Sequence, residues 1–182
     1  MMGQTHLAGG VALAITCEAA SRVMGFTLFD SHLALDTESG IAVMTAVGLA
    51  GIASLLPDLD HPKSKASNLN IITRMISAVV RSVTTHRGLT HWILTCLAFT
   101  GIVYLVWPFL AIWFFIGYAS HLLLDMMTIS GIKVLKPFSS QTCYLLPKFL
   151  RFRTGAWAEM GFRLLCWVVA ALLLAWQVSE LI

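Results

Sequence analysis

Long apolar stretches, separated by shorter polar segments, dominate the chain. Those that approach the length of a membrane span cover residues 7–29, 40–56, 92–107, 109–129 and 162–178. Because a helix needs roughly 20 apolar residues to cross a bilayer, the pattern predicts about five transmembrane helices. Pro108 separates the third stretch from the fourth, which predicts a tight helical hairpin. The expected fold class is all-α: a polytopic membrane helical bundle in one integral membrane domain, residues 1–182.

Two longer polar segments, residues 57–91 and 130–161, interrupt this pattern. Between positions 69 and 83 the first segment has apolar residues at helical spacing, with Arg74 and Arg81 off the apolar stripe. This pattern predicts an amphipathic helix that lies along the membrane surface. The second segment carries prolines and a glycine, and it is expected to be a loop with short helical pieces.

Composition strengthens the membrane interpretation. Hydrophobic residues make up 58% of the chain and charged residues only 12%, whereas soluble domains carry about 25% charged residues. So few charges cannot cover a globular surface, so membrane lipid is the expected partner. The net charge of +3 is too small to indicate nucleic acid. The four cysteines are scattered and predict neither a disulfide framework nor a cysteine metal site.

The positions of Lys and Arg predict an orientation. Basic residues gather in the two polar segments, whereas residues 30–39 contain none and are acidic. By the positive-inside rule, the N-terminus and both polar segments are expected to be cytoplasmic.

Histidines and aspartates gather at this same predicted face, with His32 as the one histidine outside it. The members are His6, Asp58, Asp60, His61, His86, His91, His121 and Asp125. His121 and Asp125 are four positions apart and therefore share a helix face. Ionisable residues inside a span are costly, and a bound cation would offset that cost. Alone, this pair also fits a hydrogen-bonded pair or a proton relay.

The proposed metal ligands are His6, Asp58, His86, His91, His121 and Asp125. Imidazole with carboxylate oxygen suits a divalent metal, zinc first and manganese or iron as alternatives, with one or two ions. Asp60 and His61 are candidates for ligands, for supports of the ligands or for a general base. Arg87, Lys63 and Lys65 are candidates for holding an anionic head group, or equally for topology and contact with anionic lipid.

Three motifs contain most of these residues: PDLDHP at residues 57–62, HRGLTH at 86–91 and GYASHLLLD at 117–125. Together they resemble the YdjM-type family of bacterial inner-membrane, metal-dependent hydrolases. Thr5-His6 and RTGAWAE at 153–159 fit as well, although Ala156 stands where the family usually has Ser. The resemblance implies a multi-pass protein of the inner (plasma) membrane, and some family members are associated with the DNA-damage response. It adds Glu159 as a candidate base or late ligand. The order of ligands is also similar to that of zinc-dependent phospholipase C.

The leading hypothesis is hydrolysis of a phosphoester or lipid-linked substrate, such as a phospholipid, at the cytoplasmic face. A metal would lower the pKa of its bound water toward ~7. Asp60, His61 and Glu159 are the catalytic candidates. Two alternatives stay open: a structural metal site in a scaffold or stress-response protein, and a transporter that uses His121 and Asp125 as a relay. Catalytic metal sites keep an open coordination position, whereas structural sites are closed.

Overall fold

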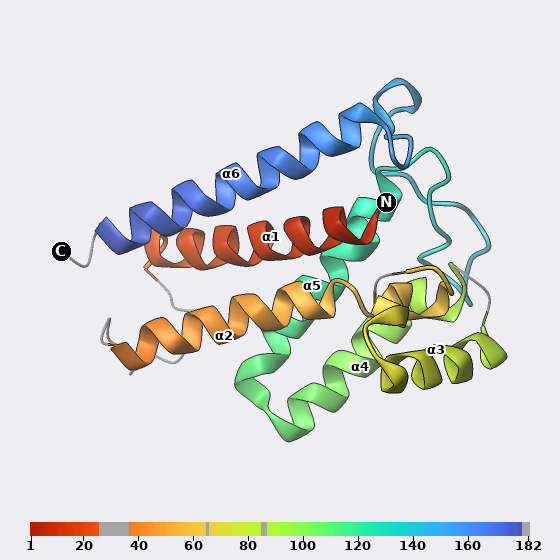
Figure 1. Cartoon of the computed structure of the whole chain (residues 1–182), viewed down its shortest axis with the longest axis horizontal. Coiled ribbons are helices and arrows are strands. Elements are labelled where there is room, and N and C mark those ends of the chain that lie inside the picture. Colours follow the sequence, from red (N-terminus) through yellow and green to blue (C-terminus); the bar gives the residue numbers. More distant parts are fainter. Residues whose placement is uncertain (26–36, 65, 85–86, 180–182) are drawn as a thin grey trace.

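Every long element in the described part of the chain is a helix, as the apolar pattern predicts (Figure 1). The structure is a computed structural model that describes residues 1–25, 37–64, 66–84 and 87–179, with backbone only for 37–42. The α-helices are α1 (Gly3–Val23), α2 (Thr37–Ala53), α3 (Ile71–Val83), α4 (Ile93–Val106), α5 (Pro108–Met126) and α6 (Trp157–Ser179). Short 3-10 turns are η1 (Pro57–Asp60), η2 (Ala66–Asn68), η3 (Leu89–His91) and η4 (Lys148–Leu150). The all-α prediction is confirmed.

Helix α1 lies at the centre of the bundle, packed against α2, α5 and α6 (Figure 1). These helices approach closely because the residues between them are small. Ala46, Ala50 and Ala53 on α2 are fully buried there. A Cβ atom on Gly117 of α5 would lie 2.1 Å from the Ala50 carbonyl oxygen, so only glycine fits there. This is the small-residue packing expected between helices in lipid.

Three segments of the described chain are long and apolar enough to cross a membrane: Val43–Asp60, Pro108–Met126 and Trp157–Ser179. The hairpin at Pro108 is present, since α4 ends at Val106 and α5 begins at Pro108. Helix α4 is apolar but has only 14 residues, about 21 Å at 1.5 Å per residue, which is shorter than a bilayer core. Helix α1 has 21 residues but buries polar side chains within the bundle. The count of five spans therefore stays a prediction for α1 and α4.

Helix α3 is the predicted amphipathic helix. It begins at Ile71, two residues after the expected start, and ends at Val83 as expected. Asn70 caps its N-terminus, and its side chain accepts a hydrogen bond from the Thr73 N–H at 2.9 Å. The apolar face points outward, with Met75 65% and Val79 67% exposed, whereas Ser77 is buried against η1. A helix that turns its apolar face away from the protein suits a membrane surface.

The polar segments lie together at one end of the bundle, away from the C-terminal end of α6 (Figure 1). The start of α1, η1, η3, the end of α5 and the start of α6 all meet there. Between α5 and α6 the chain is a loop with the short turn η4, as expected, and α6 begins at Trp157, earlier than the apolar stretch. This end of the bundle carries the predicted site.

Candidate metal centre

Four separate segments bring the predicted ligands together at the polar end of the bundle. His6 lies in the first turn of α1, Asp58 in η1, His91 in η3, and His121 with Asp125 in the last turns of α5. Each of these side chains is buried. The turn η1 follows the end of α2 and the turn η3 precedes the start of α4, so both carry their ligands at helix ends.

The ligand atoms form two overlapping groups. His6, His121 and Asp125 make one, and Asp58, His91 and His121 make the other, with the ligand atoms of each group within 4.8 Å of one another. The Nε2 atom of His91 lies 3.2 Å from His121 Nε2 and 3.5 Å from Asp125 Oδ2. Because His121 belongs to both groups, the arrangement can hold one ion or two neighbouring ions.

Hydrogen bonds behind the rings fix which nitrogen faces the cluster. His121 Nδ1 lies 2.7 Å from the Ser54 carbonyl oxygen, so it carries the proton and leaves the Nε2 lone pair directed into the cluster. His91 Nδ1 lies 3.3 Å from Asp60 Oδ2 on the side away from His121. A carboxylate behind a ligating histidine orients the ring and makes it a stronger ligand.

His6 is the member of the cluster whose surroundings would suit a bound cation best. Its ring is stacked on His121, with centroids 3.6 Å apart, and its Nε2 lies 3.4 Å from Asp125 Oδ1. Neither of its buried ring nitrogens makes a hydrogen bond to the described residues. Buried polar atoms almost always have a partner, and a divalent metal would supply one for this imidazole. The donor set therefore fits such an ion.

Two cationic groups of the protein itself also lie beside the Asp125 carboxylate. The Met1 ammonium lies 2.6 Å from Asp125 Oδ1, and Arg87 Nε lies 3.5 Å from Oδ2. Burial lowers the pKa of His91, but hydrogen bonds with Asp125 and Asp60 raise it to about 9. The metal-free imidazole is then protonated at neutral pH, so a metal would have to displace that proton.

One side of the cluster is open. Asp58 and Asp125 lie on the wall of a cavity of about 500 Å³ that is also lined by Gln4, His61, Lys63, Arg87 and Thr154, among others. His61 is half-buried, and its Nδ1 accepts a hydrogen bond from the Lys63 N–H at 3.2 Å. The predicted head-group residues Arg87 and Lys63 therefore lie at the same cavity as two of the predicted ligands.

Asp60 lies behind His91 and outside both ligand groups. Its Oδ2 accepts hydrogen bonds from the Thr90 hydroxyl at 2.6 Å and from the Arg87 N–H at 3.0 Å. Of the roles expected for Asp60, this position suits support of a ligand. It also fixes Arg87, whose φ of 61° is unusual for a residue other than glycine.

Glu159 lies at the start of α6, outside both ligand groups and outside the lining of this cavity. Its Oε1 accepts a hydrogen bond from the Met2 N–H at 2.6 Å, and its Oε2 accepts one from the Gly155 N–H at 2.6 Å. Both oxygens thus hold the beginning of the chain against the loop before α6. His86 and Lys65, also predicted at the site, lie outside the described residues.

Sequence reasoning missed several supporting groups. Thr90 donates to Asp60, and the Tyr118 hydroxyl donates to the Thr90 carbonyl oxygen at 2.7 Å. Both residues lie inside the motifs that carry the ligands, which was the available signal. The Ser54 carbonyl, which orients His121, leaves no trace in the sequence because any residue has one.

Comparison with known proteins decides the family. Residues 1–181 match the family described as YdjM inner membrane protein. This chain belongs to the YdjM family. It is a membrane protein, as its apolar helices also indicate.

Individual relatives agree with this family. The chain is 35% identical over 161 residues to the uncharacterized protein YvsG of Bacillus subtilis, covering 87% of this chain and 85% of that relative. It is 37% identical over 95 residues to the inner membrane protein YdjM of Escherichia coli, covering 47% of this chain and 46% of the relative. No solved structure matches the chain.

Proposed function

We propose that this YdjM-family protein is a metal-dependent hydrolase that acts on a phosphoester or lipid-linked substrate at the membrane surface. The observation that carries this proposal is the open cavity in front of the ligand cluster. Asp58 and Asp125 belong both to the ligand groups and to the cavity wall. A metal held there would have a position accessible to water and substrate, which a closed structural site lacks.

The cavity also has the charge that a phosphoester needs. Arg87 and Lys63 line it, and their cations would hold the phosphate oxygens beside the ligand cluster. Arg87 is fixed from behind through its N–H bond to Asp60 and its contacts with Ser130 and Gly131. Its guanidinium would therefore bind with little loss of conformational entropy.

A bound divalent metal would supply a water of lowered pKa and would polarise the phosphate. His6, Asp58, His91, His121 and Asp125 would hold it, and Asp60 would keep the His91 ring in place. His61 is the proton-transfer group of this proposal. As an imidazolium it would give a proton to the leaving alkoxide as the bond from phosphorus to that oxygen breaks. The ring would return to the neutral form, in which its Nδ1 accepts the Lys63 N–H.

The experiment compares metal content with hydrolysis in the same preparations. Wild type, His121→Ala, Asp125→Asn and His61→Gln would be purified in detergent, analysed for bound metal, and assayed on a panel of phosphodiesters and phospholipids. We expect His121→Ala and Asp125→Asn to lose metal and activity together. His61→Gln should keep its metal and lose activity by about 100-fold or more.

Two outcomes would contradict the proposal. Unchanged metal content in His121→Ala and Asp125→Asn would show that the cluster is not the metal site. Metal-loaded wild type that hydrolyses nothing on the panel would favour the alternative, a structural metal site in a membrane scaffold or stress-response protein. Lys148→Ala is the control, because Lys148 is exposed in η4 and lines neither group nor cavity. It should match wild type in both measurements.

A further inference from the structure

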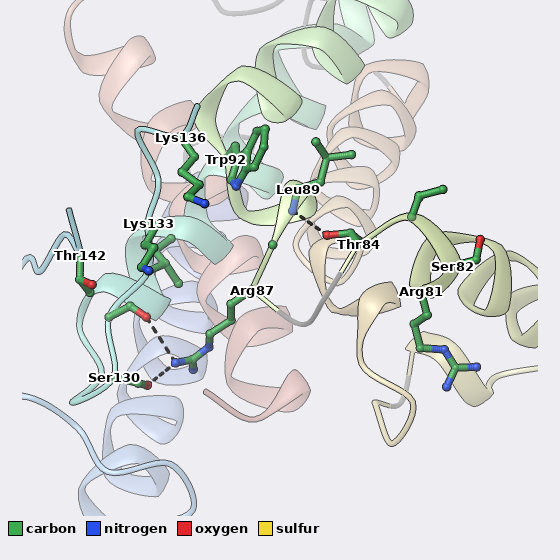
Figure 2. Close-up of a pocket in the computed structure, with 14 residues that line it drawn as sticks. Arg81, Ser82, Thr84, Arg87, Leu89, Trp92, Ser130, Lys133, Lys136 and Thr142 are labelled. Carbon is green, nitrogen blue, oxygen red and sulfur yellow. Dashed lines mark hydrogen bonds between the residues drawn. The ribbon is translucent and has the colours of Figure 1, made fainter. Parts of the chain in front are cut away.

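A second and larger cavity, of about 780 Å³, lies between the end of α3 and the loop that follows α5 (Figure 2). Its charged lining residues are Arg81, Arg87, Lys133 and Lys136. None of the described residues that line it is acidic. In Figure 2, Lys133 and Lys136 lie on one side of Arg87 and Arg81 lies on the other, so the cations of the lining come from more than one side.

Both guanidinium groups donate to backbone carbonyl oxygens, and that of Arg87 also donates to a hydroxyl. Arg87 Nη1 donates to the Ser130 hydroxyl and to the Gly131 carbonyl oxygen, the latter at 3.3 Å. Arg81 Nε donates to the Ser77 carbonyl oxygen at 3.2 Å. Arg87 is ion-paired with Asp125 at 3.5 Å, so Arg81, Lys133 and Lys136 supply most of the positive potential that an anion would relieve. Fixed donors of this kind suit phosphate oxygens.

The rest of the cavity wall is apolar. It includes Val83, Leu89, Trp92 and Ile132. Val83 is 72% exposed and is the last residue of the outward-facing apolar face of α3. The wall of the cavity therefore continues into the face that suits the membrane surface, and Trp is a residue that favours the head-group level.

We propose that this cavity binds the phosphate head group of an anionic phospholipid. The cations would hold the phosphate, and the apolar side chains of Val83, Leu89 and Trp92 would lie along the first part of the acyl chains. A soluble phosphate compound would use the cations but would leave that apolar wall exposed. The proposal rests on the membrane location of the protein and is independent of the hydrolysis proposed above, although Arg87 lines both cavities.

The test uses the short-chain lipid dihexanoyl phosphatidylglycerol and full-length protein in detergent, with binding followed by titration calorimetry. The variant is Lys133→Ala/Lys136→Ala, which leaves Arg87 and the ligand cluster intact. We expect wild type to bind this lipid and the double variant to bind it about 25-fold more weakly, since each cation near an anionic head group contributes about fivefold. Dihexanoyl phosphatidylcholine, which is zwitterionic, should bind wild type at least about tenfold more weakly than the anionic lipid.

Two controls separate this site from a general charge effect and from the metal site. Arg74→Ala removes an exposed cation of α3 that does not line the cavity, and it should bind like wild type. Protein treated with a chelator should also keep its lipid affinity, even if the hydrolase proposal fails. Lys133→Gln, at an exposed position, replaces the double variant if that variant unfolds, with about a fivefold loss expected.

Equal affinity of wild type and the lysine variants for phosphatidylglycerol would overturn the proposal. So would binding of sn-glycerol 3-phosphate as tight as that of the lipid, because the site would then recognise phosphate alone.

Discussion

The Nε2 atoms of His91 and His121 lie 3.2 Å apart although the residues are 30 positions apart in the chain. His121 Nδ1 is committed to the Ser54 carbonyl oxygen, and His91 Nδ1 faces Asp60 and Thr90. Both Nε2 atoms therefore point into the same buried space. Two imidazoles in this position can share either a proton or a metal ion, and the carboxylates around them stabilise both kinds of positive charge.

Metal affinity should depend on pH through His91. Its pKa in the metal-free protein is about 9, so binding must displace a proton at neutral pH. We expect the apparent zinc affinity to fall about tenfold for each pH unit below 9, measured with a competing chelator between pH 6 and 8. An affinity that is constant over this range would show that no raised histidine is displaced.

Asp60→Asn should weaken the site without removing a ligand. The substitution takes away one of the two carboxylates that raise the pKa of His91, so the pH dependence should move to lower pH. It also loosens the support behind the ring, for which we expect a loss of about 10- to 100-fold in zinc affinity. Thr90→Val is the companion variant, because it removes the hydroxyl but keeps the Asp60 charge. It should weaken binding and leave the pH dependence near that of wild type.

Gly117→Ala should increase the distance between α2 and α5 and destabilise their packing. Its new Cβ would lie 2.1 Å from the backbone carbonyl oxygen of Ala50, which cannot move without shifting the helix. We expect a loss of about 1–3 kcal/mol in stability, measured by thermal unfolding in detergent, together with weaker metal binding at the adjacent His121. Gly48→Ala on α2 is the matched control, because a Cβ there meets nothing within 4 Å. A Gly117→Ala protein as stable as wild type would contradict the close approach.

Glu159→Gln distinguishes a structural role of Glu159, which holds the beginning of the chain against the loop before α6, from a role as catalytic base. Its two oxygens accept the Met2 and Gly155 N–H groups, and a glutamine presents an NH₂ group to one of them. We expect a loss of about 1–3 kcal/mol in unfolding free energy and a metal affinity reduced with it. If the base hypothesis holds instead, the variant will melt like wild type and lose only turnover.

The outward face of α3 should lie in the lipid interface. In a background without the four native cysteines, an environment-sensitive fluorophore would be attached to Ile72→Cys or to Arg74→Cys, on the two sides of the helix. In lipid nanodiscs the label at position 72 should be blue-shifted and quenched by nitroxide lipids, whereas the label at 74 should not. Equal quenching at both positions would place α3 away from the membrane surface.

The sequence by itself determined the elements whose signals are local. Apolar length defined α5 and α6, the helical period of apolar residues defined α3 to within two residues, and Pro108 defined the hairpin. These features depend on neighbouring residues only, so they can be seen without the fold. The ligand candidates were visible for the same reason, because His and Asp are rare and costly in apolar sequence.

Tertiary structure alone decided where these residues lie relative to one another. Asp58 and Asp60 are two positions apart, yet the 3-10 turn η1 sends Asp58 into a ligand group and Asp60 behind His91. Glu159 was brought to the start of α1 instead of the cluster. The cations around the larger cavity come from α3, from Arg87 shortly before η3 and from the loop after α5, about 50 residues beyond α3. Such relations depend on distances through space, which packing sets and spacing along the chain does not.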